Sequence, residues 1–303
     1  MNSLLVIGGS GFFGKSILDS YRRGRLQKWQ ITKIYIFARN AEILKNTNPE
    51  LLSNSVELIN GNIASCDSLP KASYVIHAAA SSVASKYIEA PEAERKNILS
   101  GTTNFCKLMA FGNKESKILY VSSGAVYGSS SLGMRAFSEA DAFISLDQVD
   151  ENKRHYCAAK RDSEAQILEL GKSGVKVAIA RCFAFIGKYL PRDQHSIKVK
   201  ARRKVYRSYM YADDLVHWLM SIAENAKESC PIFNVGSDEV IEIEELARLV
   251  GSFYGVGISA DKIKNGDYEF YVPSIDRAKK ELGLKINYLV SDSIIINNSL
   301  IND

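Results

Sequence analysis

Short apolar segments of strand length alternate with segments of helix length over the first two-thirds of the chain. The strand-like segments are rich in branched and aromatic residues, as expected of strands that are buried on both faces. They cover residues 4–7, 34–37, 56–59, 74–77, 118–121 and 175–180, with helix-like segments such as 14–21 and 97–111 between them. This alternation predicts the α/β class, with a doubly wound parallel sheet that is covered by helices on both faces.

The alternation loosens after Arg181, where a basic, loop-like stretch begins. Further on, the pattern predicts a helix at about 212–225, a strand at 232–235 and a helix at 243–254. We expect residues 1–180 to form the main domain and residues 181–303 to form a smaller, mainly substrate-binding portion. Elements near 205–237 are expected to return to the first domain.

A glycine-rich turn of sequence GGSGFFG, residues 8–14, follows the first predicted strand and opens a helix. The free N–H groups and partial positive charge of a helix N-terminus suit a pyrophosphate. In a Rossmann-type site, Gly8 permits the tight turn, Gly11 lets the backbone approach the phosphates, and Gly14 lets helix and strand pack closely. We therefore expect Gly8, Gly11, Phe12, Phe13 and Gly14 to bind a dinucleotide, although a purely structural turn is the alternative.

The end of the second predicted strand indicates which dinucleotide binds. A carboxylate there holds the adenosine ribose of NAD, but this strand ends in Ala38-Arg39-Asn40, without an acid. The guanidinium of Arg39 can pair with the extra phosphate of NADP in a bidentate manner. NADP(H) is therefore favoured and NAD(H) stays possible; an exposed loop arginine is the alternative reading.

Tyr156 and Lys160 lie four residues apart in a segment that favours a helix, so their side chains share one face. A tyrosine hydroxyl is a weak acid at neutral pH, and a neighbouring ammonium stabilises its phenolate. Upstream, Ser123 stands in a hydroxyl-rich loop after the strand at 118–121, at the edge of the sheet where ligands bind. This set suits proton transfer to or from a sugar oxygen while a nicotinamide exchanges a hydride.

These motifs resemble the extended short-chain dehydrogenase/reductase superfamily, in particular its NAD-dependent epimerase/dehydratase family, whose members act on nucleotide sugars. The resemblance covers nearly the whole chain and includes Gly61-Asn62-Ile63, His77-Ala78-Ala79-Ala80 and the segments 97–102, 207–214 and 233–236. It implies catalytic roles for Ser123, Tyr156 and Lys160. It also implies cofactor contacts by Asn62, Ile63, His77, Ala78 and Ala79, along with Tyr156 and Lys160.

Substrate contacts are expected from Ser123, Gly124, His195 and Arg207. The family counterpart of Arg207 commonly touches the substrate diphosphate, and the alternative is that Arg207 braces its loop against Asp213 or Asp214. His195 either protonates or positions the sugar, or is a solvated loop histidine.

The chain departs from the family pattern at four places. Ile7 stands where threonine is frequent, and Asn62 replaces a common aspartate that contacts adenine. The segment 182–187 is a variant of the usual one, and the stretch 190–207 is shorter than the usual substrate-binding region.

The residues after Ser123 restrict the reaction. Family members that dehydrate a hexose usually carry an Asp-Glu pair there, and this chain has Gly124 and Ala125. Dehydration is therefore disfavoured. We expect reduction of a nucleotide-4-keto-6-deoxyhexose, because Arg39 favours NADPH; a nucleotide-sugar 4-epimerase is the alternative. A non-catalytic relative that senses dinucleotides or binds RNA is a second alternative.

Composition limits the other classes. A net charge of +5 suits an enzyme that binds anionic nucleotides, and the five scattered cysteines are typical of free thiols in a reducing cytoplasm. No apolar run is long enough to span a bilayer, and no cysteine pair has metal-ligand spacing. We expect a cytoplasmic homodimer that binds a nucleotide sugar and no metal, nucleic acid or membrane.

Overall fold

A seven-stranded sheet is the largest sheet of the structure, a computed structural model that describes residues 1–80, 89–112, 115–128, 135–190, 197–199, 203–255, 257–260 and 268–299. Its strands stand in the order β11-β6-β5-β4-β1-β2-β3. Their bounds are β1 Asn2–Ile7, β2 Ile31–Ala38, β3 Val56–Asn60, β4 Tyr74–His77, β5 Lys117–Ser123, β6 Val177–Cys182 and β11 Ile232–Val235. β1 runs parallel to both β2 and β4, and the pairs β2–β3 and β4–β5 are parallel too. The predicted α/β class is confirmed.

The central strand β1 is apolar on both faces because both faces are covered. Leu4, Leu5 and Val6 have no exposed surface, and Ile7 is 1% exposed. Successive side chains of a strand point to opposite faces, so Leu5 and Ile7 share one of them. There they pack in one cluster with apolar side chains of two long helices, namely Phe105, Met109, Ile167 and Leu170. Burial on both faces explains why the segment reads as a continuous apolar run.

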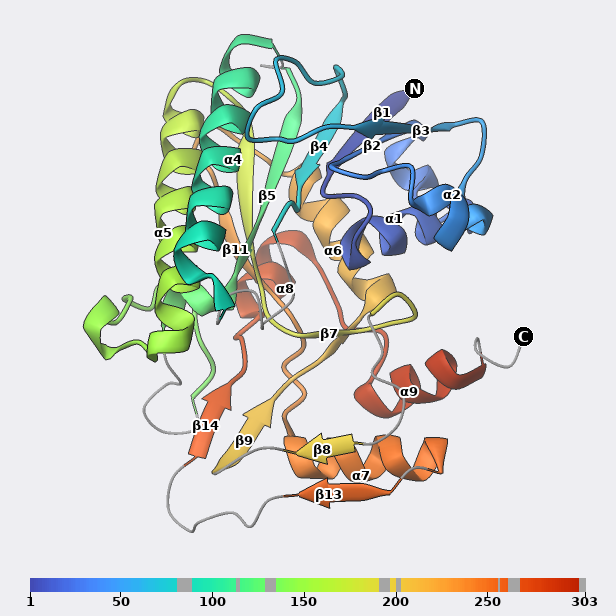
Figure 1. Cartoon of the computed structure of the whole chain (residues 1–303), viewed down its shortest axis with the longest axis vertical. Coiled ribbons are helices and arrows are strands. Elements are labelled where there is room, and N and C mark those ends of the chain that lie inside the picture. Colours follow the sequence, from blue (N-terminus) through green and yellow to red (C-terminus); the bar gives the residue numbers. More distant parts are fainter. Residues whose placement is uncertain are drawn as a thin grey trace. The chain divides into compact units, whose positions relative to one another are not determined.

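Those helices are α4 (Pro91–Gly112) and α5 (Glu151–Lys172), which lie side by side on one side of the sheet, with α1 (Phe12–Arg22) on the other (Figure 1). Asp150 caps α5 by accepting a hydrogen bond from the backbone N–H of Asn152 at 2.9 Å. Between the two helices, the hydroxyls of Thr102 and Ser163 lie 3.1 Å apart and are buried. This contact holds α5, which carries the predicted tyrosine and lysine, against α4.

The remaining helices and strands are mostly short. The helices are α2 Leu44–Thr47, α6 Ala212–Glu224, α7 Ile243–Tyr254, α8 Asp276–Leu282 and α9 Val290–Ser299. The strands are β7 Phe185–Ile186, β8 Ile197–Val199, β9 Lys204–Arg207, β10 Met210–Tyr211, β12 Ile241–Glu242, β13 Ile258–Ala260 and β14 Tyr268–Tyr271. α6, β11 and α7 confirm the three elements that were expected after residue 205. These seven strands were not predicted, because segments of two to four residues seldom show a clear period.

The chain divides into two compact units. The first comprises Met1–Ser129, Ala142–Arg181 and Val216–Phe233, and the second comprises Ser130–Asp141, Cys182–Leu215 and Asn234–Asp303. Within the second unit, β9 pairs antiparallel with β12 and parallel with β14. The assignment of residues 181–303 to substrate binding stays a prediction.

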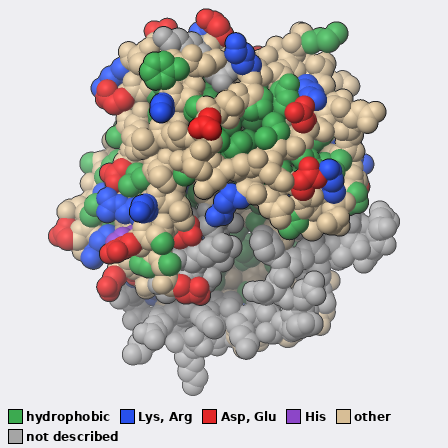
Figure 2. Space-filling model, turned by 45° about the horizontal axis from the view of Figure 1, so that its top comes forward, with side chains coloured by type: hydrophobic (Ala, Val, Ile, Leu, Met, Phe, Trp, Pro, Cys, Tyr) green, Lys and Arg blue, Asp and Glu red, His purple; other side chains and the backbone are tan. Residues whose placement is uncertain are grey.

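The described surface carries charges of both signs. Basic and acidic side chains are interspersed, with small apolar patches between them, over the described part of the face in Figure 2. Among the described residues, no helix has the length and apolar character needed to cross a membrane. Within the same residues, no group of three or more acidic, histidine or cysteine side chains is arranged to hold a metal ion.

Candidate active site

A cavity of about 350 Å³ lies where four parallel strands end in the first unit. Its walls come from the carboxyl ends of β1, β2, β3 and β4 and from one side of α4. Ligands of doubly wound sheets bind beyond the carboxyl ends of the strands, so this is the expected place for a dinucleotide. The predicted residues that line it are Gly8, Gly11, Arg39, Asn62, Ile63, Ala78 and Ala79.

The three predicted glycines differ in what a side chain would meet. Gly8 has φ +84°, and a Cβ there would lie 2.7 Å from Cα of Ala79. At Gly14, a Cβ would lie 1.9 Å from the carbonyl oxygen of Gly9. Helix α1 can therefore pack on this turn only because residue 14 has no side chain. At Gly11, by contrast, the nearest atom is 3.6 Å from the added Cβ, the carbonyl oxygen of Gly8. Gly11 lines the cavity, so its missing side chain leaves room beside the N-terminus of α1.

This arrangement fits a dinucleotide. α1 begins at Phe12, directly after Gly11, so the N-terminal end of this helix lies at the wall of the cavity. The helix dipole and the open backbone at Gly11 together suit a pyrophosphate. Phe12 and Phe13 pack edge to face with 5.8 Å between their ring centroids, and neither lines the cavity.

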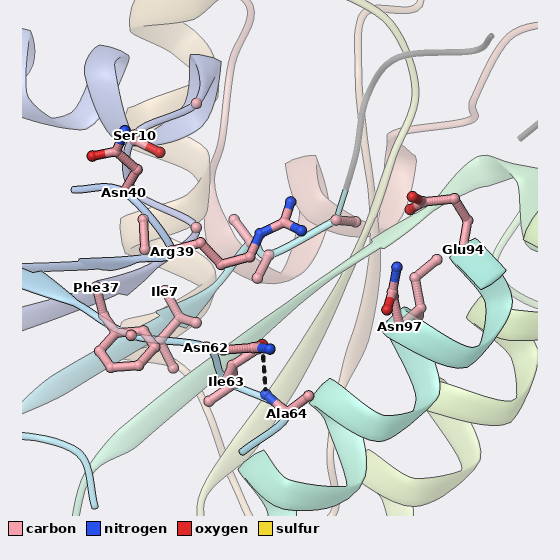
Figure 3. A pocket seen from close by; sticks show the side chains of 18 residues that line it. Ile7, Ser10, Phe37, Arg39, Asn40, Asn62, Ile63, Ala64, Glu94 and Asn97 are labelled. Carbon is pink, nitrogen blue, oxygen red and sulfur yellow. Dashed lines mark hydrogen bonds between the residues drawn. The ribbon is translucent and has the colours of Figure 1, made fainter. Parts of the chain in front are cut away.

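Polar side chains reach into the cavity from opposite walls. The side chain of Arg39, at the end of β2, extends into the cavity, and Glu94 and Asn97 stand on α4 across from it (Figure 3). Asn62 accepts a hydrogen bond from the backbone N–H of Ala64 at 3.1 Å, which holds the turn after β3 (Figure 3). The cavity therefore offers a guanidinium on one side and a carboxylate on the other.

His77 lies behind the cavity and does not line it. It is 2% exposed and packs edge to face against Phe105 and Tyr120, at centroid distances of 4.6 and 5.4 Å. Its Nδ1 accepts a hydrogen bond from the backbone N–H of Ala79 at 3.3 Å, which holds the turn that forms the wall after β4. Burial, with the charge of Lys160 adding to it, lowers the pKa of His77 from 6.5 to about 3. The imidazole is therefore neutral at physiological pH.

Tyr156 and Lys160 stand one turn apart on α5, as predicted. Lys160 is 3% exposed, and its ammonium donates a hydrogen bond to the carbonyl oxygen of Val121 at 2.9 Å. The same ammonium lies 5.9 Å from the ring centroid of Tyr156 and 5.1 Å from that of Tyr120. Tyr156 is half-buried and packs against Ile98, which lines the cavity. The pair therefore lies beside the predicted dinucleotide site.

Ser123 is the last residue of β5 and caps the 3₁₀ turn η3 (Gly124–Tyr127). Its hydroxyl oxygen accepts a hydrogen bond from the backbone N–H of Ala125 at 3.2 Å. The side chain is partly exposed, whereas Gly124 is buried. Ser123 therefore lies two residues beyond Val121, whose carbonyl oxygen accepts the hydrogen bond from Lys160.

Arg207, one of the two predicted substrate residues of the C-terminal half, belongs to the second unit. Arg207 forms an ion pair with Glu269 at 3.0 Å and stacks on the ring of Tyr271 at 5.1 Å. Its partner is thus not Asp214, whose carboxylate accepts hydrogen bonds from Asn287 at 2.6 and 2.8 Å. His195 lies outside the described residues.

Several residues of the cavity wall were not predicted as binding residues. These are Ser10, Phe37, Ala38, Asn40, Gly61, Ala64, Glu94, Asn97 and Ile98, with Ile7 and Ala80. Most are neighbours of predicted residues in the sequence. They would have been found if every residue at the end of each predicted strand had been included in the site. Glu94 carries no motif, and only the packing of α4 beside the cavity reveals it.

Comparisons with known proteins agree with this geometry. The model of the "NAD dependent epimerase/dehydratase family" matches residues 4–236. UDP-glucuronate 4-epimerase 3 of Arabidopsis thaliana is 24% identical over 328 residues, which cover 93% of this chain and 72% of the relative. UDP-glucuronate 4-epimerase 1 of the same plant is 22% identical over 324 residues, with coverages of 93% and 72%.

Solved structures share the fold at low sequence identity. The dTDP-glucose 4,6-dehydratase DesIV from Streptomyces venezuelae, with NAD bound, has a TM-score of 0.82 at 17% identity, covering 99% of this chain and 97% of its own. The UDP-glucose 4-epimerase of Thermotoga maritima, with UDP-glucose, has a TM-score of 0.77 at 19% identity, with coverages of 99% and 98%.

The two glycines at the start of α1 are expected to respond differently to the same substitution. Gly14→Ala should lower the free energy of unfolding by about 3 kcal/mol or more, because the new Cβ overlaps backbone. Gly11→Ala should cost about 1 kcal/mol, as alanine is a poorer N-cap residue, and should weaken dinucleotide binding at least tenfold, about 1.4 kcal/mol. Urea denaturation and calorimetric titration with NADH and NADPH measure these effects. Equal affinity of Gly11→Ala and the parent protein would contradict the predicted pyrophosphate position.

The buried neutral His77 makes stability depend on pH. Its pKa is lowered from 6.5 to about 3 on folding, so between these values the unfolded chain binds a proton that the folded chain does not. The contribution of His77 to the free energy of unfolding is therefore complete above pH 6.5. It is lost as the pH falls, by up to about 1.4 kcal/mol per pH unit. In His77→Gln, the free energy of unfolding measured by urea denaturation should fall less steeply between pH 6 and pH 4 than in the parent protein. Identical slopes in the two proteins would count against a neutral imidazole.

Proposed function

Because the chain belongs to the NAD dependent epimerase/dehydratase family, we propose that it is a nucleotide-sugar 4-epimerase with Ser123, Tyr156 and Lys160 as catalytic residues. The observation that carries this proposal is the placement of Tyr156 and Lys160 on one face of α5, beside the cavity. The activity named for both curated relatives, 4-epimerisation of UDP-glucuronate, supports this choice of reaction.

Each of the three side chains has a distinct task in this proposal. A bound nicotinamide dinucleotide, held by the glycine turn, Arg39 and Asn62, supplies reversible hydride exchange at C4 of the sugar. Tyr156 removes the proton of the C4 hydroxyl as that carbon is oxidised and returns it on reduction. Lys160, fixed by the carbonyl of Val121, places a positive charge near the Tyr156 ring and stabilises its phenolate. The Ser123 hydroxyl donates a hydrogen bond to the same sugar oxygen.

Residues beyond Ser123 disfavour dehydration. Elimination of the C6 hydroxyl needs a group that protonates the leaving oxygen and a base that removes the C5 proton. The residues that follow Ser123 are Gly124 and Ala125, which have no side chain able to do either.

Reduction of a nucleotide-4-keto-6-deoxyhexose is the second candidate, and Arg39 favours it. A reductase consumes reduced cofactor in each cycle, whereas an epimerase regenerates its cofactor. The Arg39 side chain extends into the cavity at the end of β2, where a guanidinium suits the additional phosphate of NADPH (Figure 3). A homodimer and a cytoplasmic location also stay predictions.

Retention of both Tyr156 and Lys160 counts against a non-catalytic relative that senses dinucleotides or binds RNA. Such relatives typically lose one of the two residues.

The test of the epimerase proposal is conversion of UDP-glucuronate to UDP-galacturonate, followed by NMR, with only catalytic amounts of NAD or NADP. Tyr156→Phe should lower kcat by about 100-fold or more, because only the proton-transferring hydroxyl is lost, while dinucleotide affinity stays nearly unchanged. Tyr21→Phe is the matched control, because its hydroxyl bonds the carbonyl of Thr32 at an exposed site. Near-normal kcat in Tyr156→Phe would show that another group moves the proton.

Arg39 provides a second, independent test, which separates the two candidates. If NADPH is the working cofactor, it should bind more tightly than NADH, and Arg39→Ala should narrow the difference. Arg248→Ala removes an arginine paired with Glu244 on α7 and serves as the control. A preference for NADH of tenfold or more, about 1.4 kcal/mol, would refute the role of Arg39 and remove the support for the reductase.

A further inference from the structure

We infer that a buried network of Ser122, Glu164, Arg181 and Tyr127 positions the Ser123 hydroxyl for the reaction. All four residues are buried, at 1–4% exposed, so each acts through Ser123 rather than on the ligand. The inference rests on the proposed function, in which the Ser123 hydroxyl bonds the sugar oxygen.

The network begins at the residue beside Ser123. The hydroxyl of Ser122 is 3% exposed and donates a hydrogen bond to Oε1 of Glu164 at 2.6 Å. Arg181 binds the same carboxylate through Nε and Nη2, with the closest distance, 2.8 Å, between Nη2 and Oε2. Nη1 of Arg181 donates to the hydroxyl of Tyr127 at 3.0 Å. Both ends of the turn after β5 are thus connected through one ion pair.

The alternation of side chains along a strand explains how this network reaches Ser123. Successive residues of β5 point to opposite sides, so Ser122 points into the interior while Ser123 stays partly exposed. Anchoring the Ser122 side chain therefore fixes the backbone from which the Ser123 hydroxyl projects. A displacement of about 1 Å is enough to lower a rate strongly when a group must meet a reacting atom.

Side chains of helix α5 also bind the backbone of the same turn. Lys160 donates to the carbonyl of Val121 at 2.9 Å, and Nε of Arg161 donates to the carbonyl of Val126 at 2.8 Å. With Glu164, three side chains of one helix segment therefore hold residues 121–127. Because Tyr156 belongs to this helix, the network also sets the position of Ser123 relative to Tyr156.

Arg181 keeps its positive charge inside the network. Burial alone would lower the pKa of Arg181, but the hydrogen bonds and charge of Glu164 raise it above its ordinary value. Both partners are nearly buried, with 5% and 4% of their side chains exposed. Replacing such a pair by apolar residues is often neutral or stabilising, so a contribution to stability does not by itself account for it. A requirement for fixed geometry does.

The experiment compares two buried serines of the same strand region. Ser122→Ala removes the hydroxyl that bonds Glu164, and Ser116→Ala removes a hydroxyl that is also 3% exposed and bonds the carbonyl of Ala72 at 2.6 Å, before β5 begins. With UDP-glucuronate as probe, Ser122→Ala should lower kcat about tenfold or more with KM within about twofold, because ground-state binding is kept. Ser116→Ala should leave both constants unchanged. Tyr127→Phe, which removes only the hydroxyl that Arg181 bonds, should resemble Ser122→Ala.

A double-mutant cycle asks whether Ser122 acts through Ser123. If it does, Ser122→Ala combined with Ser123→Ala should be no slower than Ser123→Ala alone. Amide hydrogen exchange of residues 122–128 should rise in Ser122→Ala and not in Ser116→Ala, whichever sugar is the substrate. Unchanged exchange, additive effects on kcat, or equal kcat in the two alanine variants would each overturn the inference. Loss of activity in Tyr156→Phe alongside equal kcat in the two alanine variants would leave the proposed function standing without the network. If the parent protein turned over no sugar, the proposed function would be refuted instead. The exchange measurement alone would then show whether the Ser122 hydroxyl orders the turn after β5.

Discussion

Parallel pairing of the strands in the first unit is the constraint on which the site depends. Because β1, β2, β3 and β4 run in the same direction, their carboxyl ends meet at one edge. The turn after each strand then contributes to a single cavity, although these turns are far apart in the sequence. The same direction carries Ser123 to that edge at the end of β5. The proposed cofactor cavity and the proposed catalytic serine therefore lie at the same edge of one sheet.

Charges buried near this edge are each compensated in a different way. Lys160 has a backbone carbonyl and two aromatic rings around its ammonium, and Arg181 has a full carboxylate partner. His77, close to Lys160, avoids a second positive charge by staying neutral. Unpaired buried charge is costly, and each of these three groups avoids that cost either by having a partner or by staying neutral.

The strands of the large sheet and the catalytic candidates were predictable because their signals are local. Continuous apolar runs give the strands, the glycine spacing marks the turn before α1, and a four-residue interval places Tyr156 and Lys160 on one helix face. Among the strands from β7 onward, all but β11 were not predictable, since most of them pair with residues 30 or more positions away. Glu94 and Glu269 escaped notice for the same reason. Glu94 reaches the cavity, and Glu269 meets Arg207, only after the chain has folded, and neither belongs to a motif.

Helix α5 carries two sets of residues with different tasks, and this has a consequence for how the protein can change. Tyr156 and Lys160 are the proposed catalytic residues, while Arg161 and Glu164 hold the turn after β5. One residue inserted between them would rotate the two sets by about 100° relative to each other, since a helix has about 3.6 residues per turn. Length variation is therefore excluded from this segment. Substitutions remain available at exposed positions such as Asp162 and Glu169, so redesign of α5 has to proceed by exchange of surface side chains and never by insertion or deletion.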